Sequence, residues 1–185
     1  MELAEIIRIQ AEADLIYSFE EIEAAIERMA EEITLELADK NPIVLCLMIG
    51  AVIPTGKLLP LLNFPLQVEY VHATRYQGET NGGELHWIRK PTIELQDRHV
   101  LIVDDILDEG TTLKAIVDEC KSQQAKTIQT AVLADKQLNR ERTFKQADFT
   151  GVMVPNRYVF GYGMDYKEYL RNAPGIYAVK PGTRS

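Results

Sequence analysis

The stretch "HVLIVDDILDEGTT", residues 99–112, joins the pattern of a buried strand to the pattern of a ligand site. An apolar run leads into an acidic segment, 104–109, which is followed by Gly110, Thr111 and Thr112. An uninterrupted apolar run is typical of a strand covered on both faces, as in a parallel sheet. Because open parallel sheets bind ligands beyond the carboxyl ends of their strands, we expect a functional site at residues 104–112.

The rest of the chain alternates between predicted helices and strands. Helical patterns cover 2–39, 52–62 and the residues from about 111, and strand patterns cover 41–50, 66–76, 99–104 and 125–135. Segments 85–90, 157–166 and 175–180 are strand-like, and 77–84 and 139–148 are polar connections. Ser18 and Glu21 have the spacing of a capping box. This alternation predicts an α/β fold with a mostly parallel central sheet flanked by helices, and a hairpin loop at 77–84.

Length and composition exclude several classes of protein. A chain of 185 residues, 46% hydrophobic and 26% charged, predicts one globular domain, 1–185. The net charge of −8 argues against nucleic-acid binding, which needs a basic surface. The chain has neither a signal-peptide pattern nor an apolar run of about 18 residues, so we expect no membrane partner and a cytoplasmic location. Cys46 and Cys120 lack metal-ligand spacing and are expected to be reduced core residues.

The chemistry of the acidic turn points to a phosphorylated ribose. Gly110 lets several backbone N–H groups converge, and the start of the following helix adds partial positive charge, which together suit a phosphate. Asp104 and Asp105 have the wrong sign for a phosphate but suit ribose hydroxyls or a divalent metal. A simple helix cap at Asp108 and Thr111 is the structural alternative. A P-loop is excluded because its G-x-x-x-x-G-K-[ST] pattern is absent.

Two longer segments carry a family resemblance. "VLIVDDILDEGTTL" resembles the phosphoribosyl-pyrophosphate motif of type I phosphoribosyltransferases, and "RYVFGYGMDYKEYLRNAPGIYAV", residues 157–179, is similar to the C-terminal segment of the hypoxanthine-guanine branch. Segments 44–51 and 132–136 extend the match to roughly residues 40–180. The resemblance implies a small hood, formed from the N-terminal helix region and the C-terminal segment, and a mobile loop at 74–88 that closes over the site.

The same resemblance implies a purine-salvage enzyme. Its reaction moves 5-phosphoribose from phosphoribosyl pyrophosphate to N9 of hypoxanthine or guanine, giving IMP or GMP and pyrophosphate, with Mg²⁺ as cofactor. A homodimer or homotetramer is expected. Two alternatives stay open, namely a xanthine-preferring transferase and a non-catalytic nucleotide-sensing regulator on the same fold. The presence of Asp108 and the acidic charge favour the enzyme.

Matching positions suggest a role for each site residue. The resemblance makes Asp108 the catalytic carboxylate at purine N7. It assigns ribose and phosphate binding to Asp104, Asp105, Glu109, Gly110, Thr111 and Thr112, purine binding to Lys136, Tyr158 and Val159, pyrophosphate binding to Ile49, Gly50, Arg75, Tyr76 and Arg171, and magnesium binding to Asp104, Asp105 and Asp165.

The pyrophosphate loop departs from the family pattern. Relatives usually carry Lys or Arg where this chain has Ile49, so a cation is missing before Gly50. Arg75 stands where the closing loop usually has Ser, and we expect it to replace the lost cation in part. Glu109 and Thr111 also differ from residues common in the family. The three histidines, His72, His86 and His99, have no metal-ligand spacing and receive no role.

Overall fold

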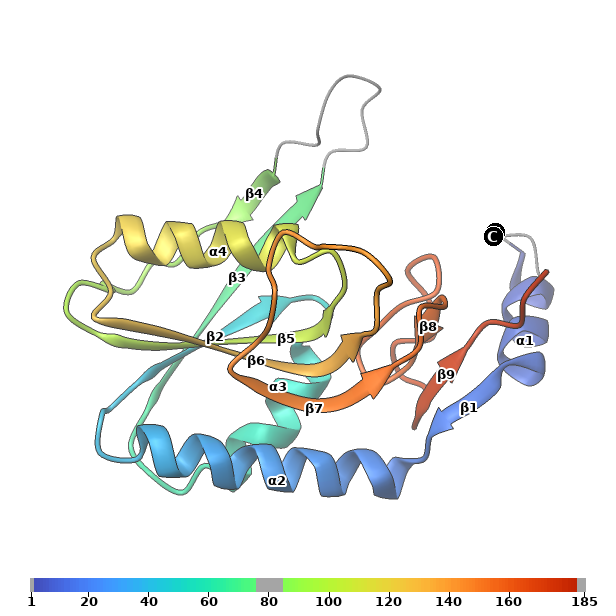
Figure 1. The fold of residues 1–185 in the computed structure, drawn as a ribbon, viewed down its shortest axis with the longest axis horizontal. Coiled ribbons are helices and arrows are strands. Elements are labelled where there is room, and N and C mark those ends of the chain that lie inside the picture. Colours follow the sequence, from blue (N-terminus) through green and yellow to red (C-terminus); the bar gives the residue numbers. More distant parts are fainter. Residues whose placement is uncertain (1, 76–84, 183–185) are drawn as a thin grey trace.

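A computed structural model describes residues 2–75 and 85–182 of the protein (Figure 1). Its central sheet has six strands in the order β4-β3-β2-β5-β6-β7. Five strands run parallel and only β4 is antiparallel to its neighbour, β3. The strands are β2 (Ile43–Met48), β3 (Gln67–Arg75), β4 (Leu85–Arg89), β5 (His99–Leu107), β6 (Thr127–Lys136) and β7 (Phe149–Val154). The predicted α/β class with a mostly parallel sheet is therefore confirmed.

Helices cover both faces of this sheet. On one face lie α2 (Phe19–Leu37) and α3 (Val52–Leu58), which continues into a short 3₁₀ turn, η1 (Leu59–Leu61), and on the other lies α4 (Thr111–Ser122) (Figure 1). The predicted capping box starts α2, because Ser18 Oγ accepts the Glu21 N–H and the Glu21 carboxylate accepts the Ser18 N–H at 2.8 Å. None of the helices in the described ranges combines the length and apolar character that a membrane span requires.

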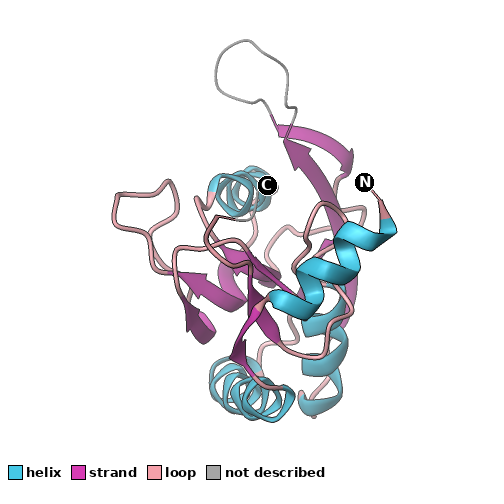
Figure 2. Cartoon of the chain, turned by 90° about the vertical axis from the view of Figure 1, so that its right-hand side faces the viewer, coloured by secondary structure: helices cyan, strands magenta, loops and turns pink. Residues whose placement is uncertain are grey.

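A second, smaller sheet joins the two ends of the chain. It contains β1 (Asp14–Tyr17), β9 (Ile176–Ala178) and β8 (Val159–Phe160) in the order β1-β9-β8, and α1 (Leu3–Glu12) packs beside it (Figures 1 and 2). The prediction that 2–39 is helical throughout is wrong at β1. Four residues carry too little pattern to identify a strand, and this one is held by antiparallel pairing with β9, some 160 residues away.

Two further predictions need correction near the C-terminus. β7 was not predicted, although it pairs with β6 along most of its length. The strand-like segment 157–166 forms only the two-residue β8, because Gly161, Tyr162 and Gly163 have positive φ and turn the chain. Both Cys46 and Cys120 are buried and free, as predicted.

The central strand β5 is longer than its apolar run suggested. It extends to Leu107, because its register with β6 continues through Asp104↔Val132 to Leu107↔Asp135. Asp104 and Asp105 therefore lie inside the strand rather than after it, and only Asp108 and Glu109 follow its end. The acids therefore fall into two groups, with Asp104 and Asp105 on a rigid strand and Asp108 and Glu109 in a turn.

Candidate active site

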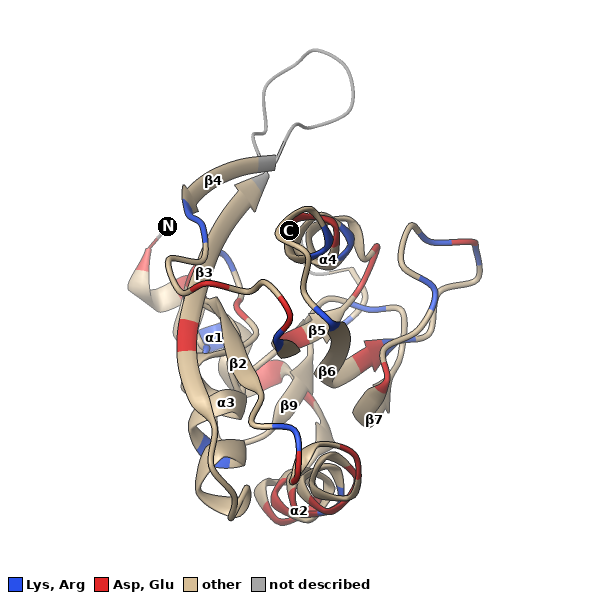
Figure 3. Cartoon of the chain, turned by 90° about the vertical axis from the view of Figure 1, so that its left-hand side faces the viewer, with Lys and Arg blue, Asp and Glu red and all other residues tan. Residues whose placement is uncertain are grey.

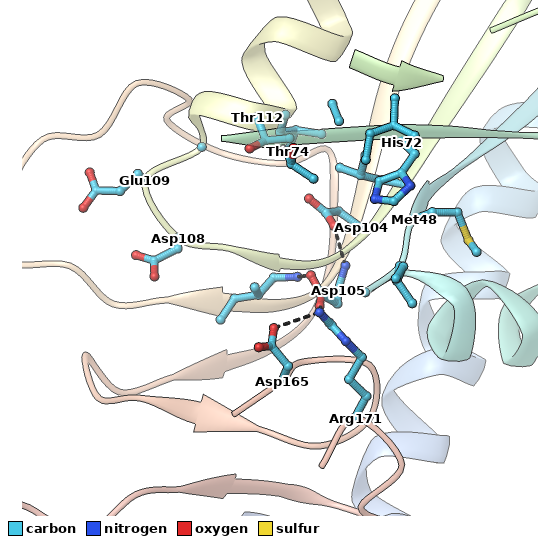
Figure 4. Close-up of a pocket in the computed structure, with 18 of the residues that line it drawn as sticks. Met48, His72, Thr74, Asp104, Asp105, Asp108, Glu109, Thr112, Asp165 and Arg171 are labelled. Carbon is cyan, nitrogen blue, oxygen red and sulfur yellow. Dashed lines mark hydrogen bonds and ion pairs between the residues drawn. The ribbon is translucent and has the colours of Figure 1, made fainter. Parts of the chain in front are cut away.

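A cleft of about 680 Å³ opens at the carboxyl ends of β2, β3 and β5 (Figure 4). The sheet order places these strand ends side by side, where functional residues from distant segments converge. The cleft is lined by Leu47, Met48, Ile49, Gly50, His72, Ala73, Thr74, Ile88, Asp104, Asp105, Ile106, Asp108, Glu109, Gly110, Thr112, Leu113, Asp165, Glu168 and Arg171.

The turn from β5 into α4 has the geometry expected of a phosphate cradle. Gly110 is the N-cap of α4 and is left-handed, with φ of +74°. A Cβ at this position would also lie 2.9 Å from the backbone nitrogen of Phe144, so both conformation and space require glycine. Gly110 and Thr112 line the cleft, whereas Thr111 is not among its lining residues. The first backbone N–H groups of α4, which have no partner within a helix, thus lie beside the cleft.

The two strand acids form an electrostatically unfavourable pair. Asp105 is 9% exposed, its N–H donates to Asp104 Oδ1 at 2.9 Å, and its own Oδ1 accepts the Ile106 N–H at 2.7 Å. Burial and the neighbouring Asp105 charge raise the pKa of Asp104 well above its usual range, and burial also raises the pKa of Asp105. Gly50 leaves room for this pair, because a Cβ there would displace the Asp105 carboxylate from its position.

Arg171 connects the C-terminal segment to these acids. Its guanidinium lies 3.0 Å from Asp165 and 3.9 Å from Asp105, and it donates to the Gly163 carbonyl at 2.7 Å (Figure 4). Gly163 has a φ of +109°, and a Cβ there would collide with the Gly50 carbonyl. The C-terminal segment is therefore packed directly against Gly50, at the turn between β2 and α3, and this contact closes one wall of the cleft.

Three carboxylates at this wall offer the donor set that magnesium prefers. Asp104, Asp105 and Asp165 all line the cleft, and a cation would offset the cost of burying negative charge that raises the pKa of the first two. Within the described ranges, no three His, Cys, Asp or Glu side chains already stand at a common metal distance. Magnesium sites of phosphate-transferring enzymes often use one or two carboxylates with waters and substrate oxygens, so these residues fit the ion.

A smaller pocket of about 300 Å³ adjoins the cleft and shares Asp105, Ile106, Asp108 and Asp165 with it. Its other lining residues are Lys136, Tyr158, Val159 and Met164. An ion pair joins Lys136, whose side chain is 12% exposed, to Asp108. Tyr158 is 42% exposed, its ring lies edge-on to Tyr166 at 5.2 Å, and partial burial of its hydroxyl raises its pKa. A planar, polar ring would find here an aromatic face, a buried ammonium and a carboxylate.

The connection after β6 braces this pocket through Arg142, which sequence analysis missed. Arg142 forms a two-point ion pair with the buried Asp135, at 2.6 and 2.9 Å, and also donates to the carbonyls of Leu107, Lys136 and Lys145. It thereby ties the residue before Asp108 to the backbone of Lys136.

The same connection also contacts the phosphate turn. The Thr143 N–H donates to the Glu109 carbonyl at 3.0 Å, and Arg140 pairs with the Glu109 carboxylate. Figure 3 shows the basic residues that this loop after β6 carries. An Arg-rich polar loop, 139–148, was the only signal in the sequence, and it did not indicate which carbonyls the arginines would reach.

The predicted pyrophosphate residues are only partly assembled. Ile49, Gly50 and Arg171 line the cleft, and Ile49 is 49% exposed. Arg75 ends β3, but its side chain and all of Tyr76 lie outside the described residues, as does the predicted loop at 77–84. Additional lining residues that received no role from the sequence are Leu47, Met48, His72, Ala73, Ile106, Leu113 and Glu168.

Comparison with known proteins gives consistent matches. Residues 12–167 match the family described as "Phosphoribosyl transferase domain". The chain is 31% identical over 166 residues to the hypoxanthine-guanine-xanthine phosphoribosyltransferase of Tritrichomonas foetus, covering 90% of this chain and 91% of that protein. It is 33% identical over 168 residues to the hypoxanthine-guanine phosphoribosyltransferase of Bacillus subtilis, covering 90% and 93%.

Similarity in three dimensions extends over almost the whole chain. The crystal structure of a hypoxanthine phosphoribosyltransferase from Staphylococcus aureus superposes with a TM-score of 0.86 at 25% identity and covers 97% of each chain. The smaller sheet and α1 therefore fall within the shared fold.

Proposed function

This chain belongs to the phosphoribosyltransferase family, and from that premise we propose that it is a purine-salvage enzyme using the residues of the cleft as follows. It transfers 5-phosphoribose from phosphoribosyl pyrophosphate to N9 of hypoxanthine or guanine and releases pyrophosphate. The observation that carries the assignment of roles is the adjacency of the two hollows. A phosphate turn and strand acids line the larger one, and Asp108 and Lys136 face the smaller one.

The donor is held by the β5–α4 turn and the strand acids. We assign the 5-phosphate to the N–H groups around Gly110, Thr111 and Thr112, and the ribose hydroxyls to Asp104 and Asp105. As the bond from C1′ to pyrophosphate breaks, positive charge develops on the ribose, and carboxylates close to it stabilise that charge.

The base is held by the smaller pocket. Tyr158 stacks on the purine, and the backbone at Val159 meets its edge. Lys136 donates to the 6-oxo oxygen, while Asp108 accepts the proton that leaves the purine when N9 bonds to C1′. In the absence of base these two side chains pair with each other. The purine therefore replaces one ion pair with two hydrogen bonds to charged groups.

Pyrophosphate departs toward Ile49, Gly50, Arg75, Tyr76 and Arg171. We assign magnesium to Asp104, Asp105 and Asp165, and when bound it supplies positive charge to the pyrophosphate oxygens. Arg171 stabilises the same developing charge from the side of Asp165. The cytoplasmic location and the homodimer or homotetramer stay predictions.

Base selection rests on Lys136. Hypoxanthine, guanine and xanthine carry an oxygen at position 6, whereas adenine carries an amino group, and a lysine ammonium has only donors. Adenine would present a donor to this ammonium where the other bases present an acceptor, and sites built to bind one polar group discriminate by about 10⁴-fold or more. Xanthine use is the second candidate, because one of the two similar enzymes above carries xanthine in its name and the other does not.

The proposal is tested by initial rates with phosphoribosyl pyrophosphate, Mg²⁺ and each of four bases. We expect nucleotide formation with hypoxanthine and guanine and at least 10⁴-fold lower kcat/KM with adenine. The xanthine rate decides between the two candidates. Nucleotide binding without turnover of any base would instead identify a non-catalytic regulator.

A further inference from the structure

The larger cleft as a whole is lined by six acids and by very few side chains that attract an anion. Among the described lining residues the acids are Asp104, Asp105, Asp108, Glu109, Asp165 and Glu168. Only Arg171 and His72 can offer a side-chain nitrogen donor. Arg171 is already engaged by Asp165, Asp105 and the Gly163 carbonyl. A polyanionic leaving group needs at least one further donor.

His72 lies next to the position where relatives usually carry a cationic side chain and this chain has Ile49. β3 runs parallel to β2, and His72 is in register with Met48, the residue immediately before Ile49. The flanking residues Val71 and Ala73 are buried in the core beneath α4, so the alternating side chains of β3 direct His72 to the other side. Figure 4 shows its imidazole at the end of the cleft beside Met48, away from Asp108.

The ring is also available for a ligand. His99, at the opposite end of the sheet, is hydrogen-bonded through Nδ1 to Thr127 Oγ1 at 2.7 Å, whereas within residues 2–75 and 85–182 the His72 ring makes no such bond. His72 is half-buried, so its donor is partly shielded from water. An imidazole N–H in this position can reach an oxygen that enters the cleft past Ile49.

We propose that His72 donates a hydrogen bond to the pyrophosphate group, in the donor and in the released product, and so replaces in part the cation that Ile49 does not supply. This inference rests on the proposed function, since it deepens the description of the same cleft. It requires only one N–H on the imidazole, so it holds for the neutral ring.

The test is calorimetric binding of magnesium pyrophosphate to the native protein and to His72→Leu. We expect about 10- to 100-fold weaker binding in the variant, the range for losing one hydrogen bond to a charged group. GMP, which has no pyrophosphate, serves as the control ligand and should bind both proteins equally. Because this assay needs no turnover, it separates failure of this inference from failure of the transferase assignment.

Two further variants separate donation from charge and from folding. His72→Gln retains an N–H donor and should recover a large part of the affinity. His99→Leu, at the opposite end of the sheet and outside the cleft lining, is the matched control and should bind pyrophosphate like the native protein. Equal pyrophosphate affinity in native protein and His72→Leu would overturn the inference. Parallel losses of pyrophosphate and GMP affinity would also overturn it, because they indicate a structural role.

Discussion

The two ends of the cleft differ in how far the protein neutralises its own acids. At the base end, Asp108 pairs with Lys136 and the buried Asp135 with Arg142, and in the adjoining β5–α4 turn Glu109 pairs with Arg140. At the pyrophosphate end, Asp104 and Asp105 stand next to each other, and the pKa of each is raised by burial. Arg171 is shared there between two carboxylates.

This difference indicates that the two ends of the cleft are neutralised in two different ways before and after substrate binds. The base end is preorganised by ion pairs and by carbonyls that Arg142 holds in place, so it is ready before substrate arrives. The end that we assign to pyrophosphate holds like charges on rigid strand positions, and we expect magnesium and substrate to neutralise them. Variants at the base end should therefore affect chemistry and stability, and variants at the pyrophosphate end should affect the response to metal.

The largest effect is expected at Asp108. Asp108→Asn keeps the shape of the side chain but removes the base that accepts the purine proton, so kcat should fall about 10²–10⁴-fold. Single-turnover and steady-state rates with hypoxanthine measure the loss, and calorimetry with the donor alone should show unchanged affinity. Retention of native kcat would remove Asp108 from the catalytic role and weaken the view that the base end is built for proton transfer.

The next largest effect is expected at the brace. Arg142→Gln leaves the Asp135 carboxylate buried at 5% exposure without its cation, and breaking a buried pair costs about 3–5 kcal/mol of unfolding free energy. Denaturant unfolding measures this loss.

The control is the double variant Asp135→Asn with Arg142→Gln, which removes both charges. It should be more stable than Arg142→Gln alone, because no unpaired buried charge remains. If the double variant loses the sum of the two single losses, Arg142 does not act through Asp135, and the base end is not held by this pair.

The smallest effect is expected at Asp104, and here the substitution should raise stability rather than lower it. The pKa of Asp104 is raised in the folded protein, so its ionised form costs folding free energy at pH above that pKa, and this cost disappears below the unfolded value of about 3.9. Asp104→Asn should therefore raise stability by about 1 kcal/mol at pH 7, or roughly 2–4 °C in Tm. The gain should shrink as the pH falls toward 4.

Magnesium provides the matching control for this stability gain. If the negative charges of Asp104 and Asp105 bind a metal ion, adding Mg²⁺ should raise the stability of the native protein more than it raises the stability of the Asp104→Asn variant. A lower Tm for the variant at pH 7 without metal would contradict the description of this end as electrostatically incomplete.

The local sequence pattern was sufficient to predict the turn between β5 and α4, but not the distant contacts that support it. Residues 99–112 contain strand, acids, glycine and helix start in one continuous run, so their arrangement follows from short-range rules. β1 could not be predicted because its four residues depend on β9.

The supports of the site come from pairings between distant segments. The partners of Arg142 include the carbonyl of Leu107, 35 residues earlier, and no local sequence pattern predicts a hydrogen bond between such distant residues. His72 could be assigned a role only when the register with Met48 placed it at the cleft.

The central claim has two parts. The turn after β5 binds the phosphoribose, and Asp108 and Lys136 give up their mutual ion pair to bind the purine base. A crystal structure with GMP bound tests it most directly. We predict phosphate oxygens about 3 Å from the N–H groups of Gly110 and Thr112, and the guanine 6-oxo oxygen about 3 Å from Lys136 Nζ, with Asp108 turned to N7. GMP bound with the Lys136–Asp108 ion pair intact and its base outside the pocket of Tyr158 and Val159 would contradict the account.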